Sequence, residues 1–215
     1  MGNVKLVWVT PDADDLVTYM ARVSAPENQQ KNESSLKLIN YLIKHKHWSP
    51  FEMVSACVEI TTTRDIGRQL LRHRSFSFQE FSQRYAAVDA LPLSPLREAR
   101  LQDTKNRQNS TPCEDDTLIS DWKVAQENVR DEANKAYQWA LENGIAKEVA
   151  RAVLPEGLTT SRLYMAGSLR SWLHFCDLRR GNGTQKETME IADQIWTTLR
   201  DVCPLILSAW ETAKE

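Results

Sequence analysis

The sequence predicts an α+β fold, in which a small, mostly antiparallel sheet is packed with several helices in a single compact domain that carries a long helical arm. Three observations predict this fold. Two apolar strand patterns lie near the start of the chain, successive helical patterns follow them, and the regular strand–helix alternation of a parallel sheet is missing. With 215 residues, the chain is long enough for one domain, residues 1–215, that buries a full core.

Both strand patterns lie in the first 63 residues. Residues 4–9 (VKLVWV) form a short apolar strand, and residues 54–63 alternate apolar and polar side chains as a half-buried strand does. A second helix is predicted from about residue 32 up to the turn in HKHWSPFE, residues 45–52. The first helix is predicted before this one, after the strand at residues 4–9. Its apolar residues recur at helical spacing: Leu16, Tyr19, Met20 and Val23.

The middle of the chain predicts one helix and two irregular segments. Thr63 is placed to cap a helix that runs to about Leu71. Arg64, Arg68 and Arg72 are spaced to share one face of it. We expect an irregular segment after this helix, and a long loop over 88–117, where three prolines occur and periodicity is weak.

Helical patterns fill the remainder of the chain. A long amphipathic helix is predicted over about 117–143, with Gly144 as its stop. A shorter helix ends at Pro155, and another covers SLRSWLHFCDLRR, residues 168–180. The sequence TQKE, residues 184–187, is typical of a capping box and predicts the start of a helix that continues through Leu199.

The composition is that of an ordinary soluble protein, with 41% hydrophobic and 26% charged residues. No apolar stretch approaches the roughly 18 residues of a membrane span, and the apolar run at the N-terminus is too short for a signal peptide. The net charge of −2 argues against general affinity for nucleic acid. We therefore expect a cytoplasmic protein without a membrane or nucleic-acid partner, in which any anion site is a local patch.

The cysteines and histidines do not predict a metal site or a disulfide framework. The four histidines occupy three separate regions, and no CxxC pair is present. Two acidic residues follow Cys113 and would raise the pKa of its thiol, which disfavours a nucleophilic role. We expect no metal, and we expect four reduced thiols that the chemistry does not need: Cys57, Cys113, Cys176 and Cys203.

The stretch RHRSFSFQEFSQRY, residues 72–85, concentrates hydrogen-bond donors. Its cations are arginine and histidine, never lysine, and phenylalanines lie between them. Arginine presents a planar fork that matches phosphates and carbonyl edges and stacks on flat rings. The stretch therefore predicts a binding surface for a ligand that is anionic, planar or both.

Three side chains of this stretch have more specific interpretations. The arginines on either side of His73 disfavour its protonation, so we expect a neutral imidazole. Glu80 either neutralises an arginine or accepts a hydrogen bond from a ligand, and Ser82 is better suited to donate to a phosphate than to act as a nucleophile. The seven glycines form neither GxGxxG nor GxxxxGK[ST], so arginine side chains and helix ends would have to hold any nucleotide.

These residues resemble a known signature. Arg72-His73-Arg74, Ser77, Ser82, Arg84 and Tyr85 match the RHRxxSxNxxSxRY motif of the flavin-dependent thymidylate synthases. Further blocks are similar to that family in the same order: ARVS (21–24), HWSPFE (47–52), EVARAVLP (148–155), SLRSWLHF (168–175) and LR (178–179). The chain departs from the family pattern at Gln79 in place of asparagine, and at Met53 and Gly183 where histidine is common.

The resemblance implies a homotetramer, with active sites shared between subunits, that makes dTMP from dUMP. Methylenetetrahydrofolate would donate the carbon, NADPH the electrons and FAD the reducing hydride. Arg179 matches the arginine that favours ionised uracil N3, which would make it the catalytic residue. The implied FAD contacts are Ser24, His47, Ser49, Glu52, Arg72, His73, Arg74, Ser168, Arg170 and His174. The implied dUMP contacts are Gln69, Arg72, Glu80, Ser82, Gln83, Arg84, Arg151 and Arg179.

Two other functions remain open at the level of sequence. The arginine- and phenylalanine-rich stretch could form a stacking groove for single-stranded nucleic acid, although the net charge and the lack of lysine enrichment argue against it. Alternatively, the same pocket could serve a flavoprotein of another activity, such as a reductase.

Overall fold

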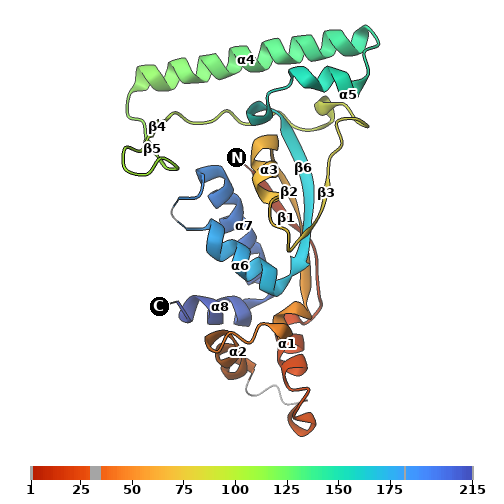
Figure 1. Ribbon diagram of the computed structural model, residues 1–215, viewed down its shortest axis with the longest axis vertical. Coiled ribbons are helices and arrows are strands. Elements are labelled where there is room, and N and C mark those ends of the chain that lie inside the picture. The colour runs from red at the N-terminus through yellow and green to blue at the C-terminus, as the bar shows by residue number, and fades with distance from the viewer. Residues whose placement is uncertain (1, 30–34, 182, 215) are drawn as a thin grey trace.

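A four-stranded antiparallel sheet runs through the middle of the molecule in the computed structural model, which describes residues 2–29, 35–181 and 183–214 (Figure 1). The strand order is β1-β2-β6-β3. The strands of this sheet are β1 Asn3–Val9, β2 Ser55–Thr63, β6 Thr160–Ser168 and β3 Ser77–Glu80. β2 and β6 pair along their whole length, from Ser55 opposite Ser168 to Thr63 opposite Thr160.

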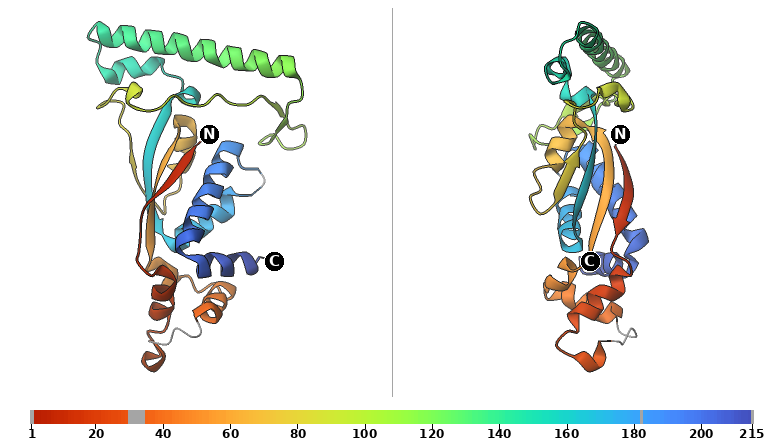
Figure 2. Two further views of the ribbon diagram at one scale, coloured as in Figure 1. Left: turned by 180° about the vertical axis from the view of Figure 1, so that it is seen from behind. Right: turned by 90° about the vertical axis from the view of Figure 1, so that its right-hand side faces the viewer.

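Helices surround this sheet on one face and at both ends (Figures 1 and 2). α6 and α7 lie along one face, α1, α2 and α8 gather at one end, and α4 crosses the other end. The α-helices are α1 Ala13–Ala21, α2 Ser35–Lys44, α3 Arg64–Leu70, α4 Asp116–Glu142, α5 Lys147–Ala150, α6 Leu169–Arg179, α7 Lys186–Val202 and α8 Pro204–Thr212. Single 3-10 turns are η1 Pro26–Asn28, η2 Ser49–Glu52, η3 Val88–Ala90, η4 Arg151–Val153 and η5 Glu156–Leu158.

The core lies between the sheet and α6 and α7. On β6, Leu163 and Met165 are fully buried and point to the same face, because side chains two residues apart share a face of a strand. Trp172 of α6 is also fully buried, and its indole nitrogen donates a hydrogen bond to the Ala56 carbonyl of β2 at 3.2 Å. That bond satisfies the one polar atom of the largest core side chain.

Two local constraints tie further segments to this core. A side chain at Gly167 of β6 would collide with the Phe76 ring, since a Cβ there would lie 2.5 Å from its Cδ1. Asp14 of α1 caps α8, accepting hydrogen bonds from the backbone amides of Leu205 at 2.9 Å and Ile206 at 3.1 Å. Burial raises the pKa of Asp14 against the opposing effect of these two amides.

The long helix α4 forms an arm that the rest of the chain covers only in part. Its C-terminal half packs with α5 around buried Tyr137 and Ala140, and Gly144 ends the arm with a φ of 78°. By contrast, Leu118, Trp122 and Val129 are spaced to form one stripe on the helix and remain exposed. The predicted amphipathic helix is confirmed, but part of its apolar face is not buried by this chain.

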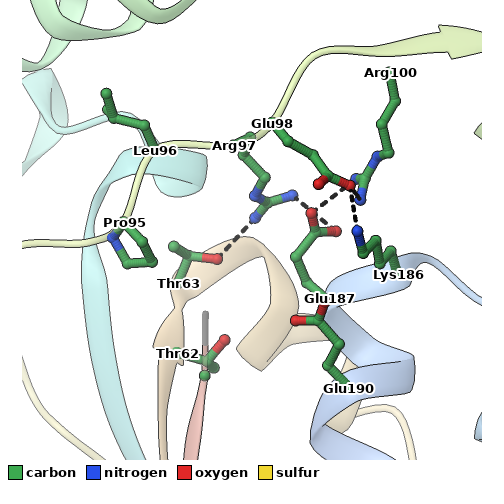
Figure 3. A pocket seen from close by; sticks show the side chains of 11 residues that line it. Thr62, Thr63, Pro95, Leu96, Arg97, Glu98, Arg100, Lys186, Glu187 and Glu190 are labelled. Atoms are coloured by element: carbon green, nitrogen blue, oxygen red, sulfur yellow. Dashed lines mark hydrogen bonds and ion pairs between the residues drawn. The ribbon is translucent and has the colours of Figure 1, made fainter. Parts of the chain in front are cut away.

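The segment between β3 and α4 is tied to the fold rather than free. It contains η3 and a two-stranded sheet of β4 Arg100–Gln102 and β5 Ser110–Pro112. Arg97 forms an ion pair with Asp65 of α3. Arg100 forms an ion pair with Glu187 of α7 (Figure 3). The prediction of a long loop over 88–117 is therefore correct for most residues but missed this hairpin.

The fold class is confirmed, while several predicted details are wrong. Local sequence patterns predict no element at β6 or α8, and they predict an irregular segment where β3 forms. The TQKE capping box does not form, because Gln185 occupies the N-cap position and Glu187 binds arginines instead. In α1 the buried residues are Ala13, Val17 and Thr18, whereas Tyr19 and Met20 are exposed. Val23 lies beyond the end of α1 and is also exposed.

We expect Leu163→Ala to lower the free energy of unfolding by about 2–5 kcal/mol, because it leaves a cavity in the central strand. Val7→Ala, at an exposed position of β1, is the matched control and should have little effect. Urea unfolding of both variants at one protein concentration measures the difference. Equal unfolding midpoints for the two variants would contradict the core position of β6.

Candidate functional site

The first cluster of predicted site residues forms where β2 begins and β6 ends. Because Ser55 lies opposite Ser168, the preceding turn η2 and the following helix α6 are neighbours. Arg170 donates to the Glu52 carboxylate at 2.7 Å, and the Ser168 side chain caps α6. The pKa of Glu52 is held below its ordinary value, mainly by a hydrogen bond from Ser168 and to a lesser degree by Arg170. The cluster is thus a fixed pair of opposite charges at a helix start.

His174 lies one turn further along α6, among aromatic rings. It meets Trp48 edge-on at a centroid distance of 4.9 Å and Trp210 at 5.6 Å. These rings line a groove of about 600 Å³ between α2, α6 and α8, together with Lys44 and Lys46. Burial is the main cause that lowers the pKa of His174, and the positive charge of Arg170 is the next. A neutral ring therefore faces the groove.

Arg179 and His73 meet at the opposite end of α6. The Arg179 Nε–H donates to His73 Nε2 at 2.9 Å, which requires the imidazole to be neutral at that nitrogen. The pKa of His73 is lowered to about 4, mainly by burial and to a lesser degree by the positive charges of Arg179 and Arg72. The neutral imidazole expected from the sequence is confirmed, although burial rather than the flanking arginines is the main cause.

Gln69 lies near the end of α3, a few residues before His73 in the chain. Its side chain is held from both sides. Its amide nitrogen donates to Gln185 Oε1 at 2.6 Å. Its carbonyl oxygen accepts from the Thr188 hydroxyl at 2.9 Å. Both partners come from the start of α7, so this helix fixes the Gln69 side chain.

The remaining candidate substrate contacts begin at Glu80, the last residue of β3, and continue beyond it. Glu80 accepts from the Ser161 hydroxyl at 2.7 Å and lies 3.5 Å from Arg64, so it does neutralise an arginine. Arg84 pairs with Glu148 at 3.0 Å and is mostly exposed. Glu148 belongs to α5, and Arg151 begins the next element, η4.

Gln83 is buried in this region, and its amide nitrogen has no hydrogen-bond partner among the described residues. An unsatisfied buried donor is costly, so it marks a place where a further acceptor is required.

The chain does not bring all of these residues into one pocket. Ser168 and Ser161 stand at opposite ends of β6, about 23 Å apart at 3.3 Å per residue. Ser168 belongs to the Glu52 cluster, whereas Ser161 contacts Glu80 beside Ser82 and Arg84. One subunit therefore presents two separate parts of the predicted site.

Other predicted site residues lie on the surface. Arg72 and Arg74 are exposed in the turn between α3 and β3, and Arg72 lies beyond the end of the helix on which it was predicted. Arg68 pairs with Glu156 in η5. Ser24 and Ser49 are also exposed. His47 is exposed as well and packs edge-on against Tyr41 at a ring-centroid distance of 5.8 Å.

The polar residues that hold Gln69 were not predicted from the sequence. Gln185 and Glu187 were read as part of a capping box, and their partners lie 116 and 87 residues away in the chain. No local pattern indicates such pairs.

The thiols take no part in the clusters described above. Cys57, Cys176 and Cys203 are buried, and burial raises the pKa of Cys176 and of Cys203 to about 12. Both thiols are therefore protonated at neutral pH. Cys113, which is partly exposed, follows β5 and lines a pocket together with Gln185 and Arg100, but it makes no hydrogen bond to either among those described.

Arginines from separate segments lie beside two histidines whose pKa is lowered, an arrangement suited to an anionic ligand that is held by side chains. Residues 5–205 match the family model described as thymidylate synthase complementing protein. A probable flavin-dependent thymidylate synthase of Paramecium bursaria Chlorella virus 1 is 49% identical over 183 residues, which cover 84% of this chain and 82% of that protein. The Synechocystis flavin-dependent thymidylate synthase is also 49% identical, over 83% of this chain and 80% of that protein.

This chain belongs to the family of flavin-dependent thymidylate synthases. The fold agrees: the UMP/dUMP methylase PolB from Streptomyces cacaoi, solved bound with 5-Br dUMP, superimposes with a TM-score of 0.86. That protein is 30% identical, and the match covers 99% of this chain and 95% of the other. None of the helices in the described ranges has the length and apolar character that crossing a membrane requires.

We expect the low pKa of His73 to make the protein less stable in acid. The unfolded chain binds a proton near pH 6.5 but the folded chain only near pH 4, so stability falls as the pH drops through this window. His73→Gln, which cannot be protonated there, should reduce this loss. Urea midpoints at about pH 7 and about pH 5 measure it. An equal loss in both proteins would show that His73 is not responsible.

Proposed function

We propose that this chain catalyses the reductive methylation of dUMP to dTMP, with methylenetetrahydrofolate as the carbon donor, NADPH as the reductant and FAD as the hydride carrier. Membership of the family supports the reaction class. The single observation that carries the residue assignment is the hydrogen bond from Arg179 to neutral His73. We further propose that residues 1–215 act as one catalytic domain in the cytoplasm.

The hydrogen bond to His73 gives Arg179 a defined task. Its Nε–H is occupied by His73, which leaves the two terminal nitrogens of the guanidinium for a substrate. A cation fixed beside the uracil ring stabilises negative charge at N3 and so raises electron density at C5. Because His73 is neutral, it orients the guanidinium without adding a second positive charge.

The residues present fit a flavin dinucleotide. Arg72, Arg74 and Arg170 supply positive charge for its phosphates, and aromatic side chains are available for its rings. The unsatisfied amide nitrogen of Gln83 offers a donor on the dUMP side. When bound, FAD supplies the hydride that reduces the transferred carbon.

We propose that the active site is shared between subunits of a homotetramer. The two parts of the site lie at opposite ends of β6 in one chain, so a second chain has to complete each. The stripe of Leu118, Trp122 and Val129 on α4 offers an apolar surface for such a contact. One sheet face, with Trp8 and Tyr164, is also exposed.

We expect Arg179→Ala and Arg84→Ala to fail differently. Arg179→Ala should lower kcat by about 10²–10³-fold even at saturating dUMP, because it removes a fixed charge beside the reacting ring. Arg84→Ala should mainly raise KM for dUMP, since the phosphate charge does not change during the reaction. Arg179→Lys should recover little activity, because an ammonium lacks the planar fork.

Steady-state kinetics of dTMP formation measure both effects, and Arg200→Ala on exposed α7 surface is the control. If Arg179→Ala changed only KM, its catalytic role would be wrong. Two results would favour the alternative functions: colourless protein without flavin, or bound flavin without dTMP formation.

We expect Trp122→Glu to weaken both subunit assembly and FAD retention, because it places a charge in the exposed apolar stripe of α4. Lys123→Ser, at the neighbouring exposed position, is the control. Sedimentation velocity and flavin absorbance of the gel-filtered protein report the two properties. A dissociated variant that retains FAD with unchanged affinity would argue against shared sites.

A further inference from the structure

The first turn of α7 carries a carboxylate that the assignments above leave unused. Glu187 is only 14% exposed in its side chain, and Arg100 donates to its Oε1 at 2.7 Å. Its Oε2 lies 3.6 Å from Arg97, which donates to the Thr63 hydroxyl at 2.8 Å (Figure 3). Arg97 also donates to Asp65 at 2.8 Å. Glu187 is therefore a fixed anion between two arginines of the segment that precedes α4.

Two hydrogen bonds connect this carboxylate to Gln69. Gln185 Nε2 donates to Glu187 Oε2 at 2.9 Å, and Gln69 Nε2 donates to Gln185 Oε1 at 2.6 Å. On its other side, the Gln69 carbonyl accepts from the Thr188 hydroxyl at 2.9 Å. The chain of contacts thus runs from Arg97 and Arg100 to a residue that the proposed function places against dUMP.

The direction of this chain follows from the charge of Glu187. An amide side chain can turn over and exchange its donor and acceptor ends, but a carboxylate can only accept. Gln185 must therefore point its nitrogen at Glu187 and its oxygen at Gln69. Gln69 must then point its nitrogen at Gln185. Burial acts to raise the pKa of Glu187, but its hydrogen bonds and the two arginines lower it on balance, so it stays ionised.

We propose that Glu187 and Gln185 are positioning residues, which hold the Gln69 amide in one orientation and leave one N–H and one carbonyl lone pair of Gln69 to bind dUMP. This inference rests on the proposed role of Gln69 as a substrate contact. An amide free to turn would meet a given donor or acceptor of the nucleotide in only one of its two orientations. Binding would then carry an ordering cost that the fixed amide avoids.

Gln185→Met tests the proposal, because methionine keeps the length of the side chain and removes both hydrogen bonds. We expect KM for dUMP to rise about 3–10-fold, the range for one lost hydrogen bond. We expect kcat and the flavin absorbance to stay unchanged. Glu98→Gln is the matched control, because Glu98 contacts Arg100 and Lys186 in the same cluster and should leave KM unchanged.

A double-mutant cycle shows whether the effect passes through Gln69. In a Gln69→Ala background, Gln185→Met should raise KM no further. Thr188→Val, which removes the opposite contact of Gln69 with little change in shape, should raise KM as Gln185→Met does. It provides a second test should Gln185→Met fold poorly.

Three outcomes would overturn the proposal. If Gln69→Ala raised KM but neither Gln185→Met nor Thr188→Val did, Gln69 would remain a substrate contact that needs no positioning. An equal effect of Gln185→Met with and without Gln69 would show a role elsewhere. If Gln69→Ala left KM unchanged, the dUMP assignment of Gln69 would fall too, while dTMP formation by the wild type would still support the reaction.

Discussion

The antiparallel pairing of β2 with β6 is the contact on which the rest of the structure depends. It places the end of β6 beside the start of β2, and so brings Glu52 of η2 to Arg170 of α6. Because α6 continues directly from β6, the same pairing directs that helix along the sheet. Arg179, ten residues after Leu169, then lies about 15 Å further along, at the level of His73.

The same pairing separates the predicted site residues within one chain. A strand of nine residues separates its two ends by more than the width of a nucleotide base, and the predicted flavin and substrate residues lie at both ends. The arm α4 and one face of the sheet leave apolar side chains exposed in the isolated chain. The separated residues and the uncovered surfaces are the two observations that support the proposed assembly with further copies.

Electrostatics in the candidate site rest on a division between paired and available cations. Arg64, Arg68, Arg97 and Arg100 are paired with carboxylates and hold segments together. Arg179 instead donates to a neutral imidazole, so its charge is not cancelled. Arg84 and Arg170, which the proposed function places at ligands, are also paired, with Glu148 and Glu52, so pairing alone does not separate structural arginines from binding ones. Arg179 differs from these arginines in having a neutral partner, and sequence spacing alone does not reveal that difference.

Local patterns in the sequence determined the fold class, most helices and two strands, because periodicity is a property of neighbouring residues. The donors of the RHRSFSFQEFSQRY stretch predict an anionic or planar ligand, and this stays a prediction. Local patterns did not determine β6. Its alternation of Ser161, Leu163 and Met165 is short, and small or polar residues surround it. Tertiary structure alone decided that this segment is central, that Glu187 binds Arg100 rather than capping a helix, and that α7 fixes Gln69. Those contacts join residues far apart in the chain, and only folding brings them within hydrogen-bond distance.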